Sequence, residues 1–237
     1  MIKYHDAPSV LTVLRELADP EIVTFKDEKY AIRVDNSLGI YIKDLKALAK
    51  EIKKDDKLAL ELFGSGVYEA QILCSKLFNP KSITPELIER WVSAFNSWEL
   101  CDSFCMSFIG QSLNGYDKIF EYVLCEEEFQ KRAGFVLMVG HHFGQKKAPN
   151  EDFIRMFPLL IEGAIDDRNF VKKAVNWALR TIGKRNKDLN KLALATAEEI
   201  LRIDSATARW IAKDAIRKLS SPTVSIQDYP RDQYRPI

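Results

Sequence analysis

The segment Arg168 to Leu179, RNFVKKAVNWAL, decides the fold, because it repeats the pattern of Glu127 to Met138, EEFQKRAGFVLM. The matching positions, offset by 41 residues, are Phe129 with Phe170, Lys131 with Lys172, Arg132 with Lys173, and Ala133 with Ala174. The same step forward reaches Ile211, Lys213 and Ala215, and the same step back reaches Ile88, Arg90 and Val92. Helical repeats of this length are typical of HEAT-like helix pairs, which stack into a solenoid with one concave face. Chance agreement among amphipathic helices is the alternative interpretation.

Helical periodicity continues through almost the whole chain, and the alternation typical of strands is nearly absent. Helix starts are predicted where capping residues precede apolar runs, as at Thr84 to Glu86, at Ser97 and at Pro149 to Asp152. We predict an all-α fold, a HEAT-like helical repeat solenoid (an α-α superhelix) that forms one domain over 1–219. The proline-containing segment 220–237 lacks apolar periodicity and is predicted to be an irregular tail.

The composition is that of an ordinary globular protein, with 46% hydrophobic and 29% charged residues among 237, which excludes collagen-like and wholly disordered chains. Lys and Arg number 35 against 34 Asp and Glu, so the net charge of +1 predicts neither a nucleic-acid nor a membrane partner. No signal peptide is readable, and the longest apolar stretch, Phe104 to Leu113, is too short to span a membrane. We expect a cytoplasmic protein without a membrane partner.

The cysteines and histidines form no metal-binding pattern. The four cysteines are Cys74, Cys101, Cys105 and Cys125, and none of them forms a CxxC pair. His141 and His142 are adjacent, so on a helix they point about 100° apart and cannot face one metal together. We expect reduced cysteines that pack as small hydrophobes, and no metal site.

The region from Arg168 to Lys191 concentrates positive charge, with eight basic residues against one acid, Asp188. On a helix, one stripe would hold Lys173, Trp177, Arg180 and Lys184, and the inward stripe would hold Phe170, Ala174, Ala178 and Ile182. An aromatic side chain among cations is an arrangement that holds nucleic acid, although a solvated basic face has the same pattern. Stacked repeats would line up these cations along the concave face, which suits a phosphate backbone.

Trp98 and Asp102 are four residues apart and share a helical face with Cys105, Met106 and Ile109. Asp102 therefore interrupts an apolar stripe, and it is a local cap, a partner of a buried base, or a carboxylate placed in a cleft. The signatures GxGxxG, GxxxxGK[ST], HExxH and GxSxG are absent from the sequence.

Taken together, these segments resemble the DNA alkylation repair family of HEAT-like repeat glycosylases, the AlkD-like proteins, which remove positively charged alkylpurines. The resemblance covers roughly 11–219 and is carried by LADPE at 17–21, LGI at 38–40, Ser97 with Trp98 and Asp102, EFQKRA at 128–133, and FVKKAVNWALR at 170–180. The segments 30–37 and 41–46, on either side of LGI, depart from the family pattern.

Roles for particular residues follow from the resemblance. It implies that Asp102 is the catalytic carboxylate and that Trp98 and Trp177 flank the lesion nucleotide. It also implies that Arg132 holds a backbone phosphate and that Arg180 is a basic residue of the same cleft. Lys173 and Lys184 join this DNA-binding set through the basic stripe.

The function implied is that of a monomeric DNA glycosylase of base excision repair, without a cofactor, acting on 3-methyladenine and 7-methylguanine in duplex DNA. Alkylation places a positive charge on the base and weakens its glycosidic bond, so one carboxylate suffices. Asp102 would stabilise the oxocarbenium charge of the sugar and position a water molecule. Two alternatives remain: a non-catalytic HEAT-repeat protein that recognises damaged or structured DNA, and a scaffold for protein partners.

Overall fold

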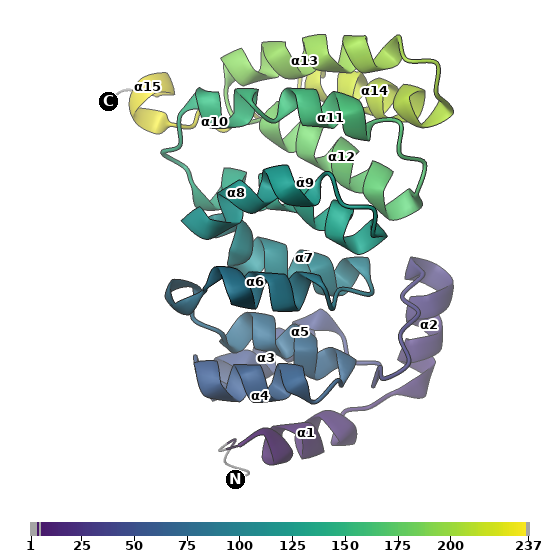
Figure 1. The fold of residues 1–237 in the computed structure, drawn as a ribbon, viewed down its shortest axis with the longest axis vertical. Helices are drawn as coiled ribbons and strands as arrows, with labels where there is room; N and C mark the ends of the chain where they lie inside the picture. The colour runs from purple at the N-terminus through teal and green to yellow at the C-terminus, as the bar shows by residue number, and fades with distance from the viewer. Residues whose placement is uncertain (1–3, 5, 236–237) are drawn as a thin grey trace. The chain divides into compact units, whose positions relative to one another are not determined.

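The computed structural model describes residue 4 and residues 6–235 (Figure 1), and that part of the chain contains α-helices, two 3-10 helices and no strand. The prediction of an all-α fold is confirmed. Cα packing divides the chain into two compact units, 1–108 and 109–237. The division made from the sequence, one repeat domain over 1–219 and a tail, stays a prediction.

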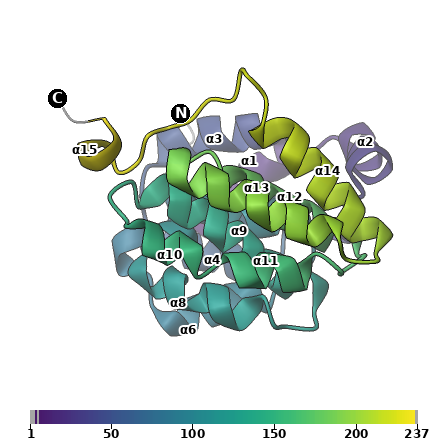
Figure 2. The same cartoon turned by 90° about the horizontal axis from the view of Figure 1, so that it is seen from above.

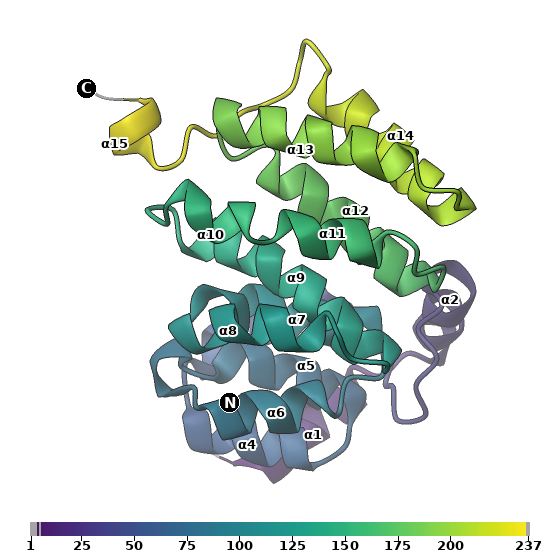
Figure 3. The ribbon, with the colours of Figure 1, turned by 45° about the horizontal axis from the view of Figure 1, so that its top comes forward.

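Unit 1 contains seven of the α-helices and one 3-10 helix among its described residues. These are α1 (Ala7–Glu16), α2 (Pro20–Tyr30), α3 (Ile42–Ile52), α4 (Asp56–Gly64), α5 (Tyr68–Leu77), the 3-10 helix Pro80–Ser82, α6 (Pro85–Val92) and α7 (Trp98–Ser107). Helix α5 is central, because α3, α4 and α7 all pack against it. Helix α2 stands to one side of this group (Figures 1 and 3).

The core of unit 1 is built around Trp91 on α6, which is fully buried. Four phenylalanine rings surround its indole, with centroids between 5.0 and 6.4 Å away: Phe63, Phe78, Phe104 and Phe108. Most of these pairs are edge-to-face or tilted, the geometry that aromatic rings prefer. The side chain of Thr84 caps α6 by accepting from the N–H of Leu87 at 3.3 Å, as the sequence predicted.

The loop between α2 and α3 is attached to the core by the buried carboxylate of Glu69 on α5. This carboxylate accepts hydrogen bonds from the successive backbone N–H groups of 38–40 at 2.7 to 3.3 Å, and from the Ser37 hydroxyl at 2.8 Å. Gly39 has a φ of +76°, and a Cβ atom added there would lie 2.0 Å from the carbonyl oxygen of Asp19. The LGI motif is thus a turn that only glycine can make at this distance from the neighbouring backbone.

Helix α3 ends in a strained residue. Lys53, its C-cap, has φ 72° and ψ −177°, a combination that is nearly reserved for glycine and costs about 1–3 kcal/mol in other residues.

Unit 2 contains the remaining α-helices of the described chain and the second 3-10 helix. These are the 3-10 helix Ile109–Gln111, α8 (Leu113–Tyr122), α9 (Glu128–Gly144), α10 (Asn150–Ile154), α11 (Phe157–Gly163), α12 (Asn169–Ile182), α13 (Lys187–Leu201), α14 (Ala206–Leu219) and α15 (Arg231–Tyr234). Helices α9, α12 and α14 pack in succession, while α8 packs on α9, α11 on α12, and α13 on α14 (Figure 2). Helix pairs therefore stack in this unit.

The 41-residue repeat holds for one step only. Helix α9 starts at 128, α12 at 169 and α14 at 206, so the spacing is 41 and then 37 residues. Phe129 and Phe170 do occupy equivalent places, and their ring centroids are 5.6 Å apart. A step of 41 residues back from α9 reaches α6. Helix α6 comes before α7, whereas α9 comes after its partner α8, so α6 and α9 are not equivalent helices. The predicted repeat at Ile88, Arg90 and Val92 was therefore wrong. Loops and helices of unequal length break the register.

Arg185 closes the C-terminal end of α9 from inside the protein. It is fully buried, lies over the ring of Phe153 at 4.2 Å, and burial lowers the pKa of its guanidinium to about 10. Its N–H groups donate at 2.9 to 3.2 Å to the carbonyls of His142, Gln145, Lys146 and Ala148. The carbonyl end of a helix carries partial negative charge, so these bonds stabilise the buried cation.

The C-terminal segment runs along unit 2 and carries a short helix, α15 (Figure 3). The backbone N–H groups of Gln227 and Tyr229 donate to the carbonyls of Lys184 and Arg185, both at 2.9 Å. The hydroxyl of Tyr234 donates to the carboxylate of Asp188 at 2.7 Å. The segment expected to be irregular is therefore hydrogen-bonded to the domain; Pro236 lies outside the described residues.

His141 and His142 are both buried and bond to different partners, as their directions on the helix predicted. His141 Nε2 pairs with the carboxylate of Asp152 at 3.2 Å, and His142 Nε2 with the side-chain oxygen of Gln227 at 3.0 Å. Burial lowers the pKa of both, that of His142 to about 4. None of the four cysteines forms a disulfide; three of them are buried and Cys125 is half-buried.

The described residues include neither a candidate membrane span nor a candidate metal cluster. None of the helices there is long and apolar enough to cross a bilayer. No group of three histidine, cysteine, aspartate or glutamate residues in that part of the chain is placed to hold a metal ion.

Gly39→Ala tests the turn at 38–40. The added methyl group would overlap the Asp19 carbonyl, so we expect the free energy of unfolding to fall by roughly 2–3 kcal/mol in urea titrations. Gly66→Ala is the matched control, because Gly66 also has a positive φ, +71°, but has open space at its Cβ position. Equal losses in the two variants would show that the contact with Asp19 is unimportant.

Candidate functional site

Trp98 and Asp102 lie one turn apart on α7 in unit 1. The helix begins at Trp98 because the Ser97 hydroxyl oxygen accepts a hydrogen bond from the N–H of Leu100 at 3.1 Å. Its apolar residues Leu100, Cys101, Phe104 and Cys105 are buried, and both Trp98 and Asp102 are half-buried. The cap and the buried face of α7 together fix the directions of the two side chains.

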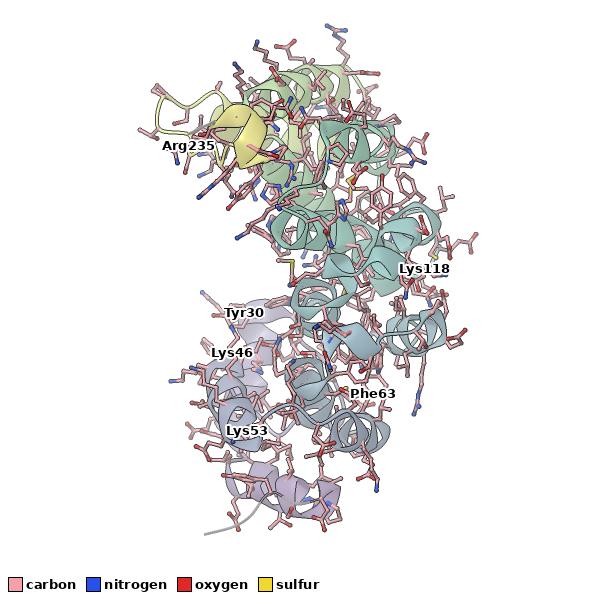
Figure 4. All side chains as sticks on the ribbon, turned by 90° about the vertical axis from the view of Figure 1, so that its left-hand side faces the viewer. Tyr30, Lys46, Lys53, Phe63, Lys118 and Arg235 are labelled. Atoms are coloured by element: carbon pink, nitrogen blue, oxygen red, sulfur yellow. The ribbon has the colours of Figure 1, made fainter. Side chains whose placement is uncertain are left out.

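The indole of Trp98 is held against α2. Its Nε1–H donates to the carbonyl oxygen of Tyr30 at 2.9 Å, and the two rings meet edge to face with centroids 6.3 Å apart. Tyr30 in turn contacts Phe25 at 5.6 Å, and these two side chains are 45% and 42% exposed. A row of three aromatic side chains therefore leads to the N-terminus of α7; Figure 4 labels Tyr30.

A cleft of about 550 Å³ opens beside Trp98. It is lined by Lys26, Tyr30, Tyr41, Ile42, Lys43, Trp98 and Glu99. Aromatic rings offer flat surfaces for stacking, and the exposed Lys43 supplies a positive charge at the cleft, so this lining suits a flat ligand that carries phosphate. Asp102 is one turn further along α7 from the edge of this cleft.

A buried polar network holds α2 in place beneath the cleft. The ammonium of Lys26 donates to the carboxylate of Glu99 at 3.0 Å and to the carbonyl of Ile40 at 2.9 Å. The hydroxyl of Tyr68 donates to Glu99 at 3.1 Å and shares a hydrogen bond with Ser97 at 2.8 Å. Burial, followed by the nearby negative charge of Glu99, raises the pKa of Tyr68, which keeps its phenol protonated as a donor. Tyr30 and Trp98 meet because this network joins their helices.

Helix α12 of unit 2 carries Lys173, Trp177 and Arg180 of the second group of predicted residues, and Lys184 lies in the turn just after the end of the helix at Ile182. Lys173 is exposed, while Trp177, Arg180 and Lys184 are half-buried. On the other side Ala174, Ala178 and Ile182 are fully buried, and Phe170 is half-buried against Phe129. The division into an inward apolar stripe and an outward basic stripe with one aromatic therefore holds within α12, apart from the partial exposure of Phe170. The prediction that Lys184 continues the stripe was wrong, because the helix ends two residues before it.

Arg180 has a partner within the protein. Its guanidinium pairs with the carboxylate of Asp214 on α14 at 3.2 Å, and its Nε–H donates to the carbonyl of Asn176 at 3.3 Å. Partial burial alone would raise the pKa of Asp214, but hydrogen bonds from Asn176 and Arg217 lower it below its usual value. Asp214 is thus held as a carboxylate, and it orients Arg180 on the surface shared by α12 and α14.

Arg132 lies at the junction of α9 and α12. It is only 5% exposed, and one of its terminal N–H groups donates to the carbonyl of Phe170 at 2.6 Å. Arg132 therefore joins the start of α12 to α9.

Four of the eight basic residues between 168 and 191 have partners within the protein. Arg168 pairs with Asp166 at 2.5 Å, Arg180 pairs with Asp214, and Arg185 is buried. Lys172 lies over the ring of Trp210 at 5.7 Å, and Trp210 is 45% exposed. The positive charge that this segment offers to a ligand is thus smaller than its composition indicates.

The family model described as DNA alkylation repair enzyme matches residues 10–219 of this chain. The chain belongs to the DNA alkylation repair enzyme family. No curated protein sequence matches it. A solved structure matches with a TM-score of 0.72 and 18% identity, over 90% of this chain and 94% of that one. That structure is described as belonging to a new family of proteins related to the HEAT-like repeat DNA glycosylases with affinity for branched DNA structures, and the likeness shows a shared fold.

All the site residues predicted for this member of the DNA alkylation repair enzyme family lie within the matched range. They divide between the two units, with Trp98 and Asp102 on α7 of unit 1 and the rest on or beside α9 and α12 of unit 2. Tyr30 and Tyr41, which line the cleft beside Trp98, were not predicted from the sequence. Both fall in the segments that depart from the family pattern, and α2 buries only Lys26, so no amphipathic stripe marked it.

Lys26→Met tests whether the buried ion pair holds α2. The change leaves the Glu99 carboxylate without its cation in a site where the two side chains are 3% and 8% exposed. We expect the free energy of unfolding in urea to fall by about 3 kcal/mol. The double variant Lys26→Met, Glu99→Met removes both charges and should recover most of that loss. A double variant as unstable as the single one would show that the two charges are not coupled.

Proposed function

We propose that this protein is a DNA glycosylase of base excision repair that removes positively charged alkylpurines, such as 3-methyladenine and 7-methylguanine, from duplex DNA. The observation that carries the proposal is the position of Asp102, half-buried and one turn from the Trp98 ring at the edge of an aromatic cleft. Membership of the DNA alkylation repair enzyme family supports it.

The chemistry needs one carboxylate because the substrate supplies its own activation. An alkylated purine carries a positive charge, so it leaves as a neutral base when the bond to C1′ breaks, and no acid has to protonate it. Asp102 stabilises the positive charge that develops on the sugar and orients the water whose oxygen bonds to C1′. The face of Trp98 attracts the cationic base and sugar, and the family resemblance assigns the same kind of contact to Trp177.

DNA is held mainly through its phosphates in this proposal. Lys173, Lys184 and Arg180 supply positive charge beside Trp177, in a monomer that uses no metal or cofactor. Arg132 joins this set through the family resemblance, although its 5% exposure leaves little of it for a phosphate to reach.

The second candidate function is recognition of structured DNA without excision. Two observations favour it: the related solved structure belongs to proteins described as having affinity for branched DNA, and Arg132 is engaged inside the protein. Both functions need a basic surface, so only the chemistry of Asp102 separates them. A scaffold for protein partners needs neither the chemistry nor the basic surface.

Asp102→Asn tests the catalytic assignment. We expect single-turnover release of 7-methylguanine and 3-methyladenine from methylated duplex DNA to slow by at least about 100-fold, because the amide cannot neutralise the sugar cation. DNA affinity should be unchanged or higher. Asp35→Asn, in the exposed turn after α2, is the matched control and should release both bases at the wild-type rate.

Absence of release by the wild-type protein, with DNA binding intact, would establish the non-catalytic function. An Asp102→Asn protein that no longer folds would show that Asp102 is structural, and Asp102→Glu would then decide whether a carboxylate is needed for release.

The basic stripe of α12 is tested by the salt dependence of DNA binding. Contacts to about four phosphates give a slope of log affinity against log salt near −3.6, and loss of each contact reduces its magnitude by about 0.9. The pair Lys173→Gln, Lys184→Gln should therefore reduce the slope by nearly 2. The control pair Lys187→Gln, Lys191→Gln removes two lysines of α13 and should leave the slope unchanged. A wild-type protein whose DNA affinity does not change with salt would favour the function of a scaffold for protein partners.

A further inference from the structure

Unit 1 has a second cleft whose charge is entirely positive. It has a volume of about 520 Å³, and its lining residues are Lys46, Ala49, Lys50, Lys53, Lys54, Ser75, Lys76 and Ser107. Five of these eight are lysines, and none is acidic. We call this feature the lysine cleft; none of its residues belongs to the site proposed for base excision.

The lysine cleft is a consequence of the helical register. Lys46 and Lys50 are four residues apart and lie along one face of α3, and Lys53 caps the C-terminal end of the same helix. Leu45 and Leu48 on the same helix are buried. Figure 4 shows Lys46 and Lys53 on the same side of unit 1 as Tyr30.

Lys76 forms the floor of the lysine cleft. It projects from α5, is half-buried, and its ammonium donates to the hydroxyl of Ser107 on α7 at 2.7 Å. Lys54 donates to the carbonyl of Phe78 at 2.7 Å. Each of these two ammonium groups keeps donors beyond the single strong bond described here, because a lysine ammonium has three.

The lysines of the cleft raise one another's electrostatic energy. Burial, followed by the charges of Lys46 and Lys54, lowers the pKa of Lys76 to about 8, and burial lowers the pKa of Lys54, which Asp56 partly opposes. The charged and polar groups around Lys76 are the four other lysines of the cleft together with Ser75, Ser103 and Ser107. An anion entering the cleft would relieve this repulsion and restore the full charge of Lys76.

We propose that the lysine cleft is a phosphate-binding site that holds the backbone of a DNA strand. The ammonium groups act as mobile point charges on phosphate oxygens, and the hydroxyls of Ser75 and Ser107 lie beside them. Such contacts carry no base preference, so the cleft adds affinity without sequence specificity. This inference rests on the proposed function in one respect, that the phosphates belong to DNA. It gives unit 1 a contact of its own with the strand, in addition to the α12 stripe of unit 2.

The test compares two triple variants with the same loss of charge. One is Lys46→Gln, Lys50→Gln, Lys76→Gln, in the cleft. The other is Lys29→Gln, Lys57→Gln, Lys81→Gln, which removes exposed lysines of unit 1 outside the cleft. Binding of each to an unmodified labelled duplex is measured by fluorescence anisotropy across a range of KCl concentrations. The cleft variant should lower the magnitude of the salt slope by about 1–2, as expected for one or two phosphates lost. The control should keep the wild-type slope.

A second arm uses inorganic pyrophosphate and needs no DNA. Pyrophosphate should raise the thermal midpoint of the wild-type protein and of the control variant, and leave that of the cleft variant unchanged. If the cleft triple variant does not fold, Lys50→Glu, a single change at an exposed position of α3, replaces it in both arms.

The two arms separate failure of this inference from failure of the proposed function. Wild-type DNA binding with equal slopes in both triple variants would overturn the cleft as a DNA contact and leave the proposed function standing. No DNA binding by the wild type would overturn the proposed function. If pyrophosphate then still raised the thermal midpoint of the wild-type protein and the control variant, but not that of the cleft variant, the site would be assigned to a free phosphate ligand. No pyrophosphate effect and no change of slope would refute the phosphate site altogether.

Discussion

The arrangement of the Trp98 region depends on one buried ion pair, Lys26 with Glu99. Helix α2 buries no other residue, so the apolar contacts that hold most helices are nearly missing from it. A charge taken out of water is costly unless it is paired and hydrogen-bonded, and here Tyr68 and the Ile40 carbonyl complete the pairing. The carboxylate of Glu69 holds the loop between α2 and α3 in the same way, because it accepts hydrogen bonds from three successive N–H groups of that loop. The aromatic cleft is therefore positioned by polar contacts between elements far apart in the sequence.

This explains which parts of the molecule could be predicted from the sequence. The all-α fold, the caps at Thr84 and Ser97 and the two stripes of α12 depend on local rules of helix capping and periodicity, and those rules held. The position of Tyr30 beside Trp98 depends on a lysine pairing with a glutamate 73 positions later, which no local pattern encodes. The repeat was readable where equivalent helices are 41 residues apart, and it was lost where the spacing is 37.

The distribution of positive charge was also only partly predictable from the sequence. The densest cluster of basic residues in the sequence, eight of them, lies between 168 and 191, yet Arg185 is a buried cap of α9, and Arg168 and Arg180 have carboxylate partners. The five lysines of the cleft, by contrast, are spread over residues 46–76, among acidic residues that do not line the cleft. A linear count therefore overstates the first cluster and misses the second, because side chains that share a face of α3 meet a lysine from α5 only after folding.

The conformation of Lys53 has an evolutionary consequence. Its backbone lies in a region that glycine occupies without strain, so a mutation to glycine would stabilise the fold and is open to natural selection. A lineage that keeps lysine there accepts the strain in exchange for the charge, and a lineage that has no use for the charge is free to drift to glycine. Glycine at this one position would thus exchange one of the five positive charges of the lysine cleft for a relaxed backbone.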